Sequence, residues 1–224
     1  MQNIRTYNDM SVEMIRSTDD PQYIVGLAQA ITMKSDLATI TPIKHKQVEF
    51  HVDAEHTSLH EHVGYTFLIQ GVSRSFLAQI TRQRTASPTS GSQHYQDYSD
   101  YDCVVSKSSQ TNSVVESTLG NAFDNYGYLV DRGVAKEEAR QVLPNAACVN
   151  YLWTIDARNL FLFLRQRLCN RNVEEMQVFA EKVLTLVTAH FPELFELAGP
   201  QCFRGKCKQG FLQCEQKFWR LKTK

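Results

Sequence analysis

Apolar positions in the first half of the chain alternate with polar ones over short segments. Val48, Phe50 and Val52 form one alternating run, and residues 63–69 form a second run that ends at Gly71. Side chains of a strand point alternately to its two faces, so a strand with one buried face shows a period of two. We expect both segments to be strands.

The other periodic segments have the spacing of helices. Asp20 and Pro21 are suited to begin a helix that extends to about residue 33, and Ser73 is suited to cap a helix that reaches Arg82. A glycine or a proline follows several of the later segments and is suited to end them. These helical patterns cover residues 113–131, followed by Gly133; 136–143, followed by Pro144; 151–168; and 173–190, followed by Phe191-Pro192.

The order of these elements predicts an α+β fold. Residues 85–110 are rich in Ser, Thr, Gln, Asp and Tyr and are expected to be loop. The expected architecture is an antiparallel sheet flanked by helices, with the strands early and a helical second half. A chain of 224 residues fits one domain, here residues 1–198, with a cysteine-containing tail over residues 199–224.

Charge and hydropathy narrow the possible partners. The 24 basic residues balance 24 acidic ones, which argues against a general nucleic-acid or membrane-surface binder. No run of 18 apolar residues is present, so no spanning helix is expected. Residues 1–5 lack the apolar core of a signal peptide, and a cytoplasmic location is the default expectation.

The segment over residues 82–95 reads RQRTASPTSGSQHY and carries the clearest chemistry. Arg82 and Arg84 stand at the end of a predicted helix, and small residues including Gly91 follow. Arginine offers a planar fork of donors to phosphate or carboxylate, and serine and glycine let backbone N–H groups approach a ligand. From these residues alone, a local anion site and a polar surface loop both remain open.

A second group of arginines lies in the predicted helix over residues 151–168. Arg158, Arg165 and Arg167 lie there among large apolar residues, and Arg140 lies shortly upstream. Burying an unpaired charge is costly. These side chains therefore either pair with acidic residues across a helix interface or face a bound anion.

Four of the six cysteines are candidates for one site, namely Cys169, Cys202, Cys207 and Cys214. In a cytosolic chain, cysteines are more often thiols or metal ligands than disulfides. Four thiolates can hold a structural zinc ion. Free or packed thiols are the alternative, because the spacing is looser than that of paired C-x-x-C motifs.

With these segments placed, the chain resembles the flavin-dependent thymidylate synthases. The family signature RHRxxSxxxxSxRY has the same frame as residues 82–95. Residues 55–67 resemble the family's histidine-containing lead-in to a strand, residues 139–144 its ARxVLP segment, and residues 156–160 its NARSL segment. The resemblance runs from roughly residue 50 to 215.

The resemblance implies an enzyme that methylates C5 of a pyrimidine nucleotide with the help of FAD. The most common reaction converts dUMP to dTMP, with methylenetetrahydrofolate as carbon donor and NADPH as reductant. It also implies a homotetramer whose active sites are shared between subunits. In such enzymes the protein orients and activates its ligands, and the cofactor carries the chemistry.

The resemblance further assigns site residues. Arg167 matches the arginine beside the pyrimidine, where a cation stabilises negative charge developing on the base. The expected flavin contacts are His56, Ser58, Glu61, Arg82, Gln83, Arg84, Ser90, Asp156 and Arg158. The expected nucleotide contacts are Gln79, Arg82, Ser90, Gly91, Ser92, His94, Arg140 and Arg167.

Three positions within the matched segments depart from the family pattern. Gln83 replaces a histidine, His94 replaces an arginine, and Asp156 replaces an asparagine. An ordinary thymidylate synthase is therefore weighed against a relative that methylates or hydroxymethylates UMP, dCMP or CMP. A flavin- or nucleotide-binding protein without turnover is a third reading, against which the retained arginines argue.

Overall fold

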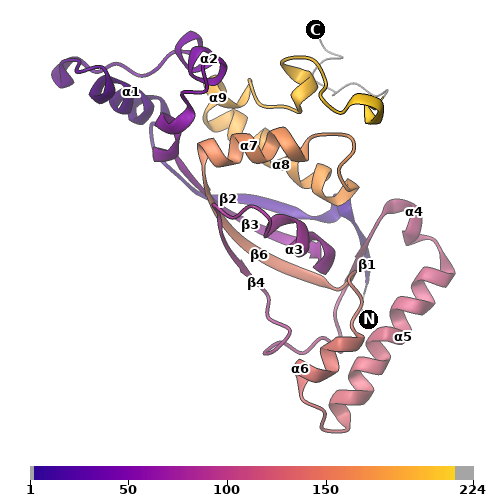
Figure 1. Cartoon of the computed structure of the whole chain (residues 1–224). Helices are drawn as coiled ribbons and strands as arrows, with labels where there is room; N and C mark the ends of the chain where they lie inside the picture. The colour runs from indigo at the N-terminus through magenta and orange to yellow at the C-terminus, as the bar shows by residue number, and fades with distance from the viewer. Residues whose placement is uncertain (1–2, 215–224) are drawn as a thin grey trace. The chain divides into compact units, whose positions relative to one another are not determined.

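Four strands form the larger sheet of this computed structural model, which describes residues 3–214 of the chain (Figure 1). They are β2 (Ser11–Ser17), β3 (Gly64–Ser73), β6 (Cys148–Asp156) and β4 (Ser87–Ser90), and they lie in this order across the sheet. A smaller parallel pair joins β1 (Ile4–Thr6) to β5 (Cys103–Val105), with Ile4 opposite Cys103.

Helices connect these strands and make up much of the second half of the described chain. The longest are α5 (Ser113–Asp131), α8 (Glu174–His190), α1 (Pro21–Thr32) and α7 (Ala157–Arg167). The shorter ones are α2 (His45–Asp53), α3 (Arg74–Ile80), α4 (Lys107–Gln110), α6 (Lys136–Ala139) and α9 (Pro192–Phe195), and 3₁₀ turns cover Thr57–His62 and Arg140–Val142.

The described chain divides into two compact units. The first unit comprises residues 3–13, 68–84 and 88–153, and the second comprises residues 14–67, 85–87 and 154–214. In the first unit the side chains of Phe76, Phe123 and Tyr126 are buried. In the second unit α7 packs against α8, and α8 packs against α9, around buried Phe163 and Phe179. Each unit therefore has an apolar core of its own.

The predicted fold class is confirmed, because the protein combines helices with an antiparallel sheet. The strand that ends near Gly71 and the helices α1, α3, α5 and α8 are present where the pattern predicts them. Gly133 follows α5 with a φ of +83°, a left-handed conformation that glycine adopts without strain, so it ends the helix as expected. Among the described residues, no helix is long and apolar enough to cross a membrane.

The strand predicted over Val48, Phe50 and Val52 is wrong, since these residues belong to helix α2. Val48 and His51 are buried and Phe50 is 62% exposed, so the buried face follows the three-residue spacing of a helix. The side chain of Gln47 accepts a hydrogen bond from the Lys44 backbone N–H at 3.0 Å and supports the first turn. Three alternating residues were too few to distinguish the two periods.

The helix predicted over residues 151–168 is correct only from residue 157, because residues 148–156 form strand β6. Tyr151, Trp153 and Ile155 are buried, while Leu152 between them is 39% exposed. This alternation is the period of a strand. One of the sheet's inner strands thus lies in the second half of the chain, which the sequence pattern had assigned to helices.

The loop predicted over residues 85–110 is wrong at three places, since β4, β5 and α4 lie within it. Ser87–Ser90 is polar because its side chains are mostly exposed, and it pairs at the sheet edge through backbone groups. Polar composition therefore concealed an edge strand.

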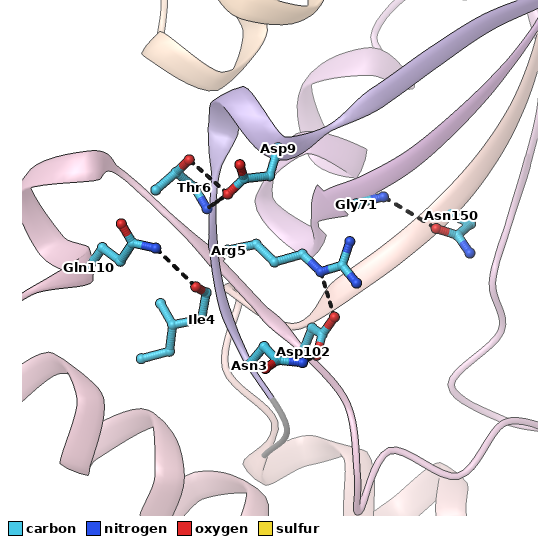
Figure 2. Close-up of polar contacts among 9 residues, drawn as sticks. All are labelled: Asn3, Ile4, Arg5, Thr6, Asp9, Gly71, Asp102, Gln110 and Asn150. Atoms are coloured by element: carbon cyan, nitrogen blue, oxygen red, sulfur yellow. Dashed lines mark hydrogen bonds and ion pairs between the residues drawn. The ribbon is translucent and has the colours of Figure 1, made fainter.

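Side-chain contacts hold the N-terminal strand β1 in the first unit (Figure 2). The Arg5 guanidinium donates to Asp102 at 2.5 Å, and the Gln110 side chain donates to the Ile4 carbonyl at 3.2 Å. The Asp9 carboxylate accepts from the backbone N–H of Thr6 at 2.7 Å and closes the turn after the strand. These contacts explain why a strand of three residues is ordered at this place.

Candidate functional site

The signature arginines lie in the first unit, directly after helix α3. Ser73 caps this helix, since its hydroxyl accepts from the Phe76 N–H at 3.1 Å. Arg82 and Arg84 follow the helix at exposed positions, and neither makes an ion pair within residues 3–214. Two such guanidinium groups are available to an anionic ligand.

The loop after β4 is fixed by backbone and side-chain hydrogen bonds within the first unit. The Gly91 N–H donates to the Asn150 carbonyl on β6 at 3.1 Å. The Ser92 hydroxyl accepts from the His94 N–H at 3.2 Å. Gly91, Ser92 and His94, all expected nucleotide contacts, are therefore held close to one another on one short loop.

His94 lies next to an acidic residue that the sequence did not single out. Its Nδ1 lies 2.9 Å from the Glu137 carboxylate of α6, and both side chains are about half exposed. The Arg140 Nε donates to the Glu137 carbonyl at 3.0 Å. Helix α6 thus brings the acidic side chain of Glu137 to His94. In the sequence, the three-residue spacing of Glu137 and Arg140 before Pro144 was the signal that could have drawn attention to Glu137.

The expected flavin contacts Glu61 and Arg158 form an ion pair within the second unit. Glu61 belongs to the 3₁₀ turn Thr57–His62, and Arg158 belongs to the first turn of α7. The pairing of helix arginines with acidic residues, one of the two alternatives for this group, is thus realised at Arg158. His56 and Ser58, which precede Glu61 in the sequence, are exposed.

Arg158 also lines a cavity of about 260 Å³ in the second unit, together with Thr57, His60 and Arg165. The Arg158 Nε is buried and has no hydrogen-bond partner within the described residues. A buried donor without a partner is destabilising unless a ligand or water satisfies it. The two guanidinium groups and the Thr57 hydroxyl are donors suited to an anionic group, and the Glu55 side chain also lines the cavity.

Asp156 acts as the N-cap of α7. Its carboxylate accepts from the Asn159 N–H at 2.9 Å and from the Asn159 side-chain amide at 2.6 Å. Aspartate and asparagine cap helices about equally well. The departure from the family's asparagine at this position is therefore compatible with the same local fold.

Arg167, the expected catalytic residue, lies on the last turn of α7 and is partly buried. Its guanidinium carbon lies 5.7 Å from the centre of the Phe163 ring, and its Nη1 donates to the Asn172 side chain at 3.5 Å. Burial lowers the pKa of Arg167 from its ordinary value. Arginine still stays charged near neutral pH, so a partly desolvated cation is held at this position.

Each of the two units contains some of the expected flavin and nucleotide contacts. Gln79, Arg82, Gln83, Arg84, Ser90, Gly91, Ser92, His94 and Arg140 belong to the first unit, and His56, Ser58, Glu61, Asp156, Arg158 and Arg167 belong to the second. Within the first, His94 lies beside the loop of Gly91 and Ser92; within the second, Glu61 contacts Arg158.

The sequence analysis assigned no site role to His60, which the structure buries. Its side chain is fully buried, and neither ring nitrogen has a partner within the described part of the chain. The ring lies 5.6 Å from that of His51. Burial and the neighbouring His51 lower the pKa of His60 to about 4. The imidazole is therefore neutral at neutral pH.

Comparisons with known proteins decide the family. The family model "Thymidylate synthase complementing protein" matches residues 13–193. A flavin-dependent thymidylate synthase of Geobacter sulfurreducens is 34% identical over 219 residues, covering 92% of this chain and 94% of the relative. The chain belongs to the flavin-dependent thymidylate synthase family. The relative of the same name from Clostridium tetani is 28% identical, over 92% of this chain and 93% of its own.

Solved structures share the fold. A UMP/dUMP methylase, PolB, from Streptomyces cacaoi bound with 5-Br dUMP superposes with a TM-score of 0.76 at 22% identity, covering 87% of this chain and 95% of its own. Thymidylate Synthase X from Helicobacter pylori with FAD and dUMP superposes with a TM-score of 0.71 at 22% identity, covering 84% and 97%. The resemblance seen in the sequence is thus confirmed, and the protein is an enzyme of this family.

Proposed function

We propose that this protein catalyses the FAD-dependent methylation of C5 of dUMP to give dTMP. The observation that carries the proposal is the signature segment. Arg82 and Arg84 are exposed after α3 without an ion pair among the described residues. The family resemblance assigns these positions to contacts with flavin and nucleotide. Relatives that match 92% of this chain are named flavin-dependent thymidylate synthases.

The residues present fit FAD and a nucleotide monophosphate. Arg84, Ser58 and Arg158 would hold the flavin, with Glu61 orienting Arg158 through their ion pair. Arg82, Ser92 and Arg140 would hold the nucleotide, whose phosphate suits guanidinium and hydroxyl donors. The other expected contacts, His56, Gln79, Gln83, Ser90, Gly91 and Asp156, belong to the same proposal.

Bound FAD, reduced by NADPH, would supply the hydride that completes the methyl group taken from methylenetetrahydrofolate. The protein's own contribution is electrostatic. Arg167 would stabilise the negative charge that develops on the pyrimidine when C5 attacks, because a fixed cation in a partly desolvated site needs no reorganisation. We further infer, from the family resemblance, a homotetramer with shared active sites.

Turnover of separate nucleotides tests the proposal. FAD-loaded protein with NADPH and methylenetetrahydrofolate should add one methyl group to dUMP, detected by product mass, and leave UMP, dCMP and CMP unchanged. Exclusive turnover of another nucleotide, or a hydroxymethyl product, would show a changed specificity. A protein that gains no flavin absorbance when FAD is added would instead be a non-catalytic relative.

A second candidate function, C5 modification of UMP or a cytidine nucleotide, is favoured by the contact of His94 with Glu137. The family's arginine offers five donors, whereas the imidazole held by Glu137 offers fewer and carries charge only when protonated. A relative of the same fold is named a UMP/dUMP methylase. The nucleotide panel distinguishes this candidate from dUMP methylation.

Replacing His94 with arginine should lower the KM for dUMP about fivefold, because a charge-assisted hydrogen bond is stronger than a neutral one by roughly 1 kcal/mol. Steady-state kinetics measure the change, with Glu137→Ala as the matched variant that frees His94 from its partner without adding a donor. An unchanged KM in the His94→Arg variant would show that position 94 does not contact the nucleotide.

A further inference from the structure

Four cysteines line one cavity of about 760 Å³ in the second unit. Cys169 follows the end of α7, whereas Cys202, Cys207 and Cys214 come from the segment after residue 200. All four are partly exposed. The other two cysteines, Cys103 and Cys148, are buried in the first unit, as cysteines that act as small apolar residues usually are.

The four thiols come from two segments of the chain and line the same cavity. Arg165 and Arg171 line the same cavity, so positive charge is already supplied around it.

The cavity is open in this structure. Within residues 3–214, no group of three or more Cys, His, Asp or Glu side chains has the arrangement needed to hold a metal ion. The segment that carries three of the cysteines has only two short 3₁₀ turns, Gln201–Phe203 and Gly210–Leu212. Such a segment can close without breaking a helix or a strand, and the free energy of metal binding can offset the cost of ordering it.

We propose that Cys169, Cys202, Cys207 and Cys214 close around one zinc ion to form a structural site. Four thiolates are the preferred tetrahedral ligand set of structural zinc, and soft sulfur ligands disfavour magnesium and calcium. Binding releases the thiol protons and leaves a net negative centre, which Arg165 and Arg171 are placed to balance. The site ties the segment after residue 200 to the end of α7, two residues beyond Arg167.

Metal analysis of the full chain tests the site. Protein purified under reducing conditions, incubated with zinc sulfate and passed through a desalting column should retain about one zinc per chain, as a closed four-cysteine site requires. The four cysteines should then resist a thiol reagent until a chelator is added. Zinc-free protein whose thiols at these positions all react at once would overturn the proposal. Zinc content is measured without substrate, so this result is independent of the proposed enzymatic function.

Single variants locate the ion. Cys202→Ala and Cys207→Ala should each lose the zinc, whereas the matched control Cys148→Ala, a buried cysteine of the first unit, should keep it. Cobalt substitution adds a readout, because tetrahedral thiolate-bound Co²⁺ gives intense visible bands. Equal zinc retention in all three variants, or absence of those bands, would contradict coordination by these cysteines.

Discussion

Replacing Arg167 with alanine is expected to lower kcat about 10²–10³-fold, the usual cost of removing one group that stabilises charge in a transition state. Arg167 is partly buried on the last turn of α7, beside the Phe163 ring. A charge in such surroundings acts through a lower effective dielectric than a solvated one. Its removal should therefore affect the chemical step more than ligand binding.

Steady-state kinetics with flavin content measured in parallel separate the two effects. The control variant Arg132→Ala removes an exposed guanidinium at the end of α5, where it lies 4.8 Å from the Tyr128 ring, and should leave kcat unchanged. Arg167→Lys keeps a positive charge without the planar fork, and should fall between the wild type and the alanine variant. A kcat within threefold of the wild type in Arg167→Ala would remove this residue from the mechanism.

The sequence predicted the fold class and most helices because long amphipathic segments carry many residues of consistent period. Its failures have local causes. The run of Val48, Phe50 and Val52 was too short to separate a helix from a strand, and β4 has no buried face to reveal its period. The boundary at Asp156 was missed because the apolar residues before and after it were assigned to a single helix.

The candidate site likewise has residues that the sequence could identify and contacts that it could not. The signature over residues 82–95 and the arginines of α7 could be found because they match short sequence motifs of the family. Contacts between distant segments could not be found in this way. The partner of His94 is Glu137, 43 positions away, and the partner of Arg158 is Glu61, 97 positions away. Only folding brings such residues together, so their pairing carries no local signal.

His60 is the clearest residue of this kind, and replacing it with leucine is expected to stabilise the protein. The side chain is fully buried, it lies 6.1 Å from the Phe191 ring, and neither ring nitrogen has a partner within the described residues. A buried polar group left without a hydrogen bond costs about 1–3 kcal/mol. Leucine is of similar size and removes that cost, so the free energy of unfolding should rise by about 1–2 kcal/mol at neutral pH.

The pH dependence of the free energy of unfolding gives a second prediction for His60. Burial and His51 lower the pKa of His60 from 6.5 to about 4 in the folded protein. Between pH 6.5 and about 4 the unfolded chain binds a proton at this histidine and the folded protein does not, so stability falls as pH falls through this window. A shift of this size corresponds to about 3 kcal/mol, most of which His60→Leu should remove.

Urea unfolding at several pH values, with equal flavin content in every sample, measures both effects. His45→Gln is the matched control, because His45 is exposed on α2 and its replacement should leave the midpoint at neutral pH unchanged. His51, whose pKa is also lowered by burial, remains in both variants and accounts for a residual acid-side loss. If His60→Leu kept the full pH dependence of the wild type, the acid-side loss of stability would have to arise from other groups, and the buried neutral imidazole would not be the residue that limits folding in acid.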